Sequence, residues 1–146
     1  MPRLLYRIFL PLLILSACGP SGREASKGDG PLFTLLSSRE SGVDFVNEIE
    51  DGIEFNILTY RNFYNGGGVA IGDINQDGLE DIFFTSNLKS NRLFLNRGDL
   101  KFEDITEKAG VGGKGAWSTG ATFADVNSDG WMDLYVCNSG HIEGDD

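Results

Sequence analysis

The sequence predicts an all-β chain in which a repeated β-unit is stacked, as in part of a β-propeller. Residues 68–84 align without gaps with residues 120–136, at an offset of 52 positions, and a period of this order is typical of stacked units such as propeller blades. The flanking segments are short, aromatic and β-branched, with polar turns between them. No proline follows Pro31, which suits a sheet-rich body because proline removes a hydrogen-bond donor.

The composition narrows the class of protein. The 146 residues are enough for one small domain. The 12 basic and 22 acidic residues give a formal net charge of −10, so we expect no nucleic-acid partner, because such a partner needs a basic surface. A hydrophobic content of 40% is too high for a disordered chain, and two cysteines exclude a disulfide-rich scaffold. The single histidine, His141, leaves little for histidine-based catalysis.

Residues 1–17 have the features of an export signal. Arg3 and Arg7 provide a positive region before a short apolar run at residues 8–15, which Pro11 interrupts. The run is too short to span a bilayer as a stable helix. A buried core helix is the alternative, but nothing in the sequence that follows would pair with it. We therefore predict a lipoprotein signal peptide over residues 1–17.

The end of this segment, Leu-Ser-Ala-Cys at residues 15–18, resembles the lipobox of bacterial lipoproteins. The resemblance implies cleavage before Cys18 and attachment of lipid to its thiol. Several acyl chains hold a protein stably on a bilayer, whereas one chain does not. An ordinary secretory signal with an incidental cysteine is the alternative. Residues 18–31 then form a lipid-anchored flexible tether of small polar residues, and the predicted location is the cell envelope, on a membrane.

The propeller part is predicted over residues 32–146, truncated at its C-terminus, with one full four-stranded blade and part of the next. The strands of the full blade are expected at residues 69–72, 82–85, 91–96 and 101–106. Residues 33–43 resemble residues 102–111, so we expect them to form an outer strand that completes another blade. Residues 44–65 have no clear assignment.

Each repeat contains the pattern Asp-x-Asn-x-Asp-Gly-x-x-Asp, at residues 73–81 and 125–133. Calcium prefers six to eight hard oxygen ligands, which alternate side chains on a tight turn can supply. The glycine at the sixth position permits the positive φ that turns such a loop. We therefore expect two Ca²⁺ sites, each with four side-chain ligands and one backbone carbonyl. The ligands are Asp73, Asn75, Asp77, Leu79 and Asp81 in the first loop, and Asp125, Asn127, Asp129, Trp131 and Asp133 in the second.

Two other interpretations of these loops are possible from the residues. An acidic hairpin turn without metal is one, because Asn, Asp and Gly favour turns, although two copies in register argue against it. An EF-hand loop is the other, but it needs an acidic ligand at the twelfth position, where this chain has Phe84 and Val136. Crowded carboxylates repel each other, so metal binding is expected to order the loops. Glu80 lies between ligands and is expected to face solvent.

The two loops, the strand at residues 91–98 and the Phe-Glu-Asp-Ile-Thr strand at residues 102–106 resemble the FG-GAP/VCBS repeats. The resemblance implies a β-propeller like the integrin α-subunit head, usually with seven blades, that binds calcium in loops of this type. Residues 31–140 as a whole resemble bacterial VCBS-repeat lipoproteins related to the ASPIC/UnbV proteins. Seven blades need several hundred residues, so we interpret the chain as an N-terminal fragment. A small protein that pairs with other chains to finish its sheets is the alternative.

Together these features favour a calcium-binding propeller-repeat module of a cell-envelope lipoprotein that binds a protein or a glycan and is not itself an enzyme. Two alternatives stay open. In the first alternative, the chain is the N-terminal part of a propeller enzyme whose active site lies in missing blades. In the second, it is a structural assembly subunit. No nucleophile motif surrounds Ser118, and the glycines of residues 112–115 lack the Walker spacing.

A few further residues have two possible roles. Trp117, Trp131 and Tyr135 are candidates for a glycan-binding platform, although aromatic residues in strands more often belong to a core. Cys137 has no partner once Cys18 carries lipid, and we expect it to be a small buried strand residue.

Overall fold

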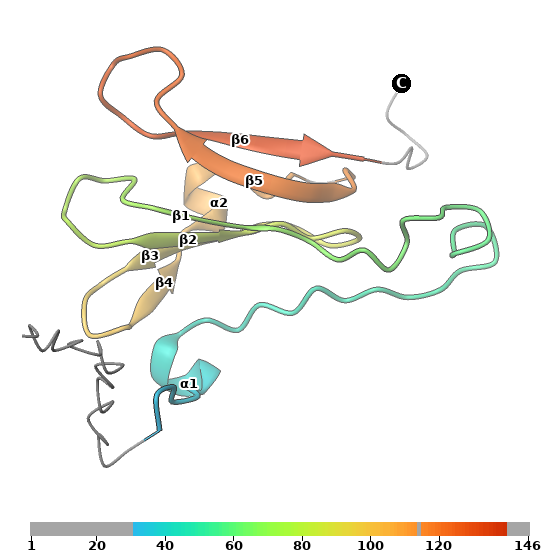
Figure 1. Ribbon diagram of the computed structural model, residues 1–146, viewed down its shortest axis with the longest axis horizontal. Coiled ribbons are helices and arrows are strands. Elements are labelled where there is room, and N and C mark those ends of the chain that lie inside the picture. Colours follow the sequence, from blue (N-terminus) through green and yellow to red (C-terminus); the bar gives the residue numbers. More distant parts are fainter. Residues whose placement is uncertain (1–30, 114, 140–146) are drawn as a thin grey trace, which may run out of the picture. The chain divides into compact units, whose positions relative to one another are not determined.

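Six antiparallel strands in two sheets form the framework of the described residues, 31–113 and 115–139, in this computed structural model (Figure 1). One sheet has four strands in the order β1 (Val69–Gly72), β2 (Asp81–Phe84), β3 (Arg92–Asn96), β4 (Phe102–Asp104). The other is a hairpin of β5 (Ser118–Ala124) and β6 (Asp133–Asn138). Two short helices are α1 (Ser38–Ser41) and α2 (Thr106–Ala109). The predicted all-β class, with one four-stranded unit and part of the next, is confirmed.

Several predicted features lie outside the described residues. These are the signal peptide at residues 1–17, the lipidated Cys18 and nearly all of the tether. Within the part of the chain that the structure describes, no helix has the length and apolar composition needed to cross a membrane. The residues from Leu35 onward form one compact body, which contains both sheets.

The two hairpins have the same register, so the sequence repeat is also a structural repeat. In the first hairpin Val69 pairs with Phe84. In the second, Ala121 pairs with Val136, and both of these residues lie at the equivalent repeat positions. The pairing of Gly72 with Asp81 is likewise repeated farther along β5 and β6. Each loop therefore leaves its hairpin at the same point.

The core lies between the first repeat unit, which is the four-stranded sheet, and the second repeat unit, which is the hairpin of β5 and β6. On one face of the first sheet Ala70, Phe83 and Leu93 are buried. The hairpin packs its apolar residues against them, and these residues are Ala121, Phe123, Leu134 and Val136. The strands β1 and β5 lie side by side in Figure 1 and are in contact. A Cβ atom on Gly68 would lie 2.8 Å from the carbonyl oxygen of Thr119, so glycine is needed here for the close approach.

The opposite faces of the two units are less covered. The hairpin residues that pack on the first sheet have counterparts at equivalent repeat positions, which are Val69, Ile71, Ile82 and Phe84. Of these, Phe84 stacks on the ring of Phe45, with 4.8 Å between centroids, whereas Ile71 is 63% exposed. On the hairpin, Tyr135 occupies the position of the buried Phe83 and is itself 63% exposed. Each unit therefore presents apolar surface on the face that does not meet the other unit.

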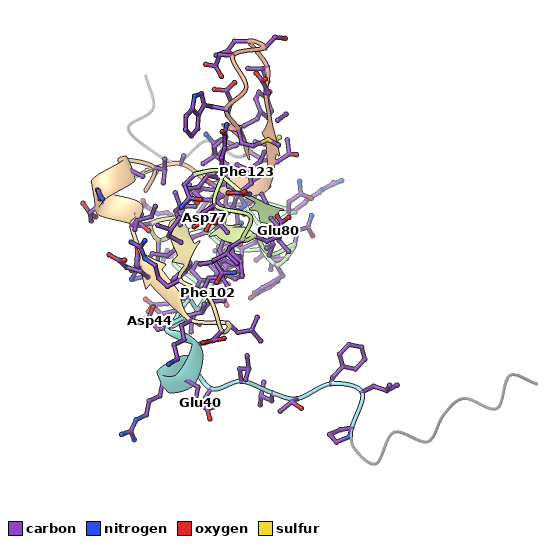
Figure 2. The ribbon with its side chains drawn as sticks, turned by 90° about the vertical axis from the view of Figure 1, so that its left-hand side faces the viewer. Glu40, Asp44, Asp77, Glu80, Phe102 and Phe123 are labelled. Atoms are coloured by element: carbon purple, nitrogen blue, oxygen red, sulfur yellow. The ribbon has the colours of Figure 1, made fainter. Side chains whose placement is uncertain are left out.

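The expected outer strand at residues 33–43 is wrong. Residues 33–37 form no strand, and α1 follows them. An outer strand needs inner strands of its own blade beside it, and the outer position of the first sheet is already taken by β4. The resemblance to residues 102–111 holds in the second half, because α1 and α2 both end at a glycine with positive φ, Gly42 and Gly110. Figure 2 shows Glu40 of α1 and Phe102 of β4.

The segment that precedes the repeat, unassigned from sequence, is attached to both sheets through side chains. The amide of Asn47 donates to Asn87 Oδ1 at 2.7 Å, and its Oδ1 accepts the backbone N–H of Asn87 at 3.1 Å. Farther along, the rings of an aromatic cluster surround Trp117, just before β5, and they belong to Phe55, Tyr60 and Phe63. The cluster joins residues 55–63 to the start of the second unit.

Candidate functional site

The two Asp-rich segments form the loops between paired strands. Residues 73–80 join β1 to β2, and residues 125–132 join β5 to β6, at the same end of the two sheets (Figure 1). The fourth and sixth residues of both loops have positive φ, at 61° for Gln76, 83° for Gly78, 62° for Ser128 and 89° for Gly130. The predicted turn at each glycine is confirmed, and both loops have the same backbone conformation at these positions.

Within the first loop the polar side chains fold back on backbone amides. Asp73 accepts hydrogen bonds from the N–H groups of Asp77 at 3.1 Å and Gly78 at 2.8 Å. Asn75 Oδ1 accepts from the same Asp77 amide at 3.2 Å, so side-chain oxygens of Asp73 and Asn75 converge on one N–H. Asp77 in turn accepts from the Leu79 amide at 2.9 Å and from Asn75 Nδ2 at 2.9 Å. Figure 2 shows Asp77 and Glu80 on this loop.

The second loop repeats this network bond for bond. Asp125 accepts from Asp129 N at 3.1 Å and from Gly130 N at 2.9 Å, and Asn127 Oδ1 also accepts from Asp129 N, at 2.8 Å. Asp129 accepts from Trp131 N at 2.8 Å and from Asn127 Nδ2 at 3.0 Å. Because these five hydrogen bonds recur at equivalent positions, the two loops place their polar atoms in the same way.

The last aspartates of the two loops differ in their surroundings. Asp81 is 0% exposed, and its two oxygens accept the backbone N–H groups of Ile74 at 3.0 Å and Asn96 at 2.7 Å. Asp133 is half-buried and accepts from Val126 N at 3.0 Å, the equivalent of the bond to Ile74. The bond to Asn96 anchors the first loop to the end of β3.

Two residues at these loops were missed by sequence reasoning. Asn96 reinforces the anchor, because its side-chain amide also donates to the carbonyl of Glu80 at 3.0 Å. Gln76 connects the loops, because its Nε2 donates to the carbonyl oxygen of Gly130 at 2.6 Å. Neither residue belongs to the aspartate pattern, and the Gln76 position is occupied by Ser128 in the other repeat. No periodicity in the sequence pointed to these contacts.

Backbone N–H groups of the first loop favour the charged form of Asp73. Hydrogen bonds from backbone N–H groups, that of Gly78 foremost, hold the pKa of Asp73 below its ordinary value of 3.8. Glu80 is exposed, as predicted for a residue that lies between the ligand positions. The carboxyl group of Asp73 is therefore ionised at neutral pH.

The donor atoms of the two loops are of the type that a hard metal ion needs. Over residues 31–113 and 115–139, no three Asp, Glu, His or Cys side chains lie together closely enough to hold one. The expected ligand set of each loop also includes an asparagine and a carbonyl, so every donor atom is an oxygen, as a hard cation such as calcium prefers. A carboxylate oxygen that accepts one N–H keeps a second lone pair. By donor chemistry, the residues of both loops fit calcium.

The other candidate residues divide into buried and exposed groups. Trp117 is 1% exposed and belongs to the aromatic cluster, as expected for core. Trp131, Tyr135 and Cys137 are exposed, so the expectation of core positions is wrong for them. Trp131 is on the loop, whereas the other two are on β6, which pairs with β5 alone among the described strands. Ser118 is buried, and its hydroxyl donates to Asn138 Oδ1 at 2.9 Å.

The stacked antiparallel units with equivalent acidic loops define a propeller-type repeat domain. The sequence profile of the FG-GAP-like repeat matches residues 55–136, which is more than half of the chain and includes both loops. The chain belongs to the FG-GAP-like repeat family. It is also similar to cartilage acidic protein 1 of Xenopus tropicalis, with 38% identity over 78 residues. That match covers 53% of this chain and 12% of the relative's length.

Proposed function

We propose that the chain is a calcium-binding propeller-repeat module of a cell-envelope lipoprotein. The observation that carries the proposal is the hydrogen-bond network of the first loop, which recurs at equivalent residues of the second loop. A turn that only reverses the chain direction can adopt many conformations. Two loops that each bind the same kind of ion need the same placement of polar atoms. The family to which the chain belongs supports the propeller part of this proposal.

Each loop would hold one Ca²⁺ through oxygen atoms. The ion would neutralise carboxylates that otherwise repel each other, and it would fix the loop to its hairpin. Asp81 and Asp133 would link the ion to the sheets, because each already binds a backbone amide of its loop. The proposed ligands are the side chains of Asp73, Asn75, Asp77, Asp81, Asp125, Asn127, Asp129 and Asp133, and the carbonyls of Leu79 and Trp131.

The proposed placement on a membrane rests on the sequence of the first eighteen residues. The positive and apolar regions followed by Cys18 support export and lipid attachment. The module would then bind a protein or a glycan outside the inner membrane, without catalysis of its own. The exposed Ile71 and Tyr135, on faces that do not meet the other unit, favour assembly with further units as a second candidate function.

Calorimetric titration of the full chain with calcium tests the first proposal. Wild type is expected to bind two ions, and Asp77→Ala and Asp129→Ala are each expected to bind one. Glu80→Gln is the matched control, because it removes a negative charge from the same loop at an exposed position outside the ligand set. Unchanged heats of binding in the Asp77→Ala/Asp129→Ala double variant would contradict the proposal.

Lipid attachment needs a separate experiment. Expression in a bacterial host with a labelled fatty acid is expected to label wild type and to leave Cys18→Ser unlabelled. Cys137→Ser is the matched control, since this cysteine is exposed and lies in the folded unit. Label that persists in Cys18→Ser would contradict attachment at this residue.

A further inference from the structure

We propose that Gln76 couples the two loops, so that a cation bound at one loop raises the affinity of the other. This inference rests on the calcium binding proposed above and goes beyond it, because two such loops need not communicate. The proposal starts from the hydrogen bond that Gln76 Nε2 donates to the carbonyl oxygen of Gly130 at 2.6 Å. The two residues are 54 positions apart in sequence.

Both ends of this contact are tied to ligand positions. Gln76 stands between Asn75 and Asp77, two proposed ligands of the first loop. The amide of Gly130 donates to Asp125 Oδ2 at 2.9 Å, so its orientation is set by a proposed ligand of the second loop. The carbonyl of the same glycine accepts from Gln76. One side chain therefore joins the ligand-bearing backbone of one loop to that of the other.

The coupling is expected to act through ordering. A cation held by Asn75 and Asp77 would fix the backbone at Gln76, whose φ of 61° is uncommon for a residue other than glycine. The side-chain amide of Gln76, held in place in this way, would restrain Gly130. The second loop would then lose less conformational entropy when it binds its own ion. A ligand that lowers the ordering cost of a second ligand produces positive cooperativity, and the effect is reciprocal.

The repeat supplies a control for this residue. Ser128 occupies the position of Gln76 in the second loop with nearly the same φ, 62°, and its shorter side chain has no hydrogen bond to the first loop among the described contacts. Gln76→Ser therefore puts into the first loop a residue that this backbone already accommodates. It removes the reach to Gly130 and keeps all the proposed ligands.

A double-mutant cycle on the full chain, with calcium as the probe, tests the coupling. The calcium affinity of the second loop is measured with the first loop able to bind, in wild type, and unable to bind, in Asp77→Ala. The wild-type affinity is expected to be about two- to tenfold higher, the range that one hydrogen bond supports. In the Gln76→Ser background the same comparison is expected to give equal affinities, with two ions still bound when the ligands are intact.

The outcomes separate the coupling from the calcium proposal. Equal affinities of the second loop in wild type and Asp77→Ala, or a difference that persists with Gln76→Ser, would overturn the coupling and leave calcium binding intact. If wild type binds no calcium, the proposed function fails. Amide hydrogen exchange of the metal-free chain then decides whether the loops communicate: faster exchange at Asp129 and Gly130 in Gln76→Ser supports the contact, and unchanged exchange overturns it.

Discussion

The buried carboxylate of Asp81 accepts the backbone N–H of Asn96 at 2.7 Å, which ties the start of β2 to the last residue of β3. Its other oxygen accepts the amide of Ile74 inside the first acidic loop. One side chain therefore holds a loop, its own strand and the next strand together. The equivalent Asp133 has the loop contact, to Val126, and is less buried.

Asp81→Ala is expected to lower the free energy of unfolding by about 3 kcal/mol, because it leaves the buried amide of Asn96 and the part-buried amide of Ile74 without an acceptor. Asp133→Ala, the matched control, is expected to cost about 1 kcal/mol, because only one exposed hydrogen bond, from Val126 N, is lost. Urea unfolding in the presence of a chelator measures both values without a contribution from metal. Equal losses for the two variants would contradict the role assigned to Asn96.

Gly68→Ala is expected to destabilise the contact between the two units by about 2 kcal/mol, because the added methyl group would lie 2.8 Å from the Thr119 carbonyl oxygen. Gly120 is at the equivalent position of the second unit. A Cβ atom added there would lie at an ordinary contact distance, 3.9 Å, from its nearest neighbour, Cys137 Cβ. Gly120→Ala is therefore expected to change the unfolding free energy by less than about 1 kcal/mol. Thermal unfolding followed by circular dichroism compares the pair, and a larger loss at Gly120 would contradict the packing.

Phe63→Ala is expected to destabilise the chain by about 3–5 kcal/mol, because a ring with 0% exposure would leave a cavity beside Trp117. The neighbouring Tyr64 is 58% exposed, and Tyr64→Ala is expected to cost much less. Tryptophan fluorescence during urea unfolding reports on the cluster directly. A small loss for Phe63→Ala would mean that residues 55–63 do not belong to the cooperative unit.

The capping box of α1 predicts a pH effect. Hydrogen bonds from the Ser37 hydroxyl, and then from its backbone N–H, hold the pKa of Glu40 below its ordinary value of 4.5. A pKa that is lower in the folded state means that ionised Glu40 stabilises the helix at pH values above its ordinary pKa. This stabilisation is lost as the pH falls through the lowered pKa. Ser37→Ala is expected to raise the pKa of Glu40 toward 4.5, as a carboxyl-carbon NMR titration would measure.

Ser38→Ala is the control for this titration, because the neighbouring serine is in α1 and makes no side-chain hydrogen bond among the described contacts. It is expected to leave the Glu40 titration unchanged. A shift of equal size in both variants would show that the hydroxyl of Ser37 is not the cause.

Local patterns predicted the strands and loops because those elements depend on neighbours in sequence. The four strands of the first unit begin within one residue of their expected positions, and β4 ends early because Thr106 starts α2. The failures depend on distant partners. Residues 33–37 were expected to pair as an outer strand whose place β4 occupies, and the contacts of Gln76 and Asn96 span 54 and 15 residues. The burial of Trp117 required rings from a segment that had no assignment.

The contact between the two units is heterologous, because one face of the first unit meets the opposite face of the second. A twofold contact uses up its surface when two copies meet. A contact of the present kind leaves a donor face at one end and an acceptor face at the other, however many units are added. The number of units in such an array is therefore limited only by curvature that brings its two ends together, or by a differently shaped cap.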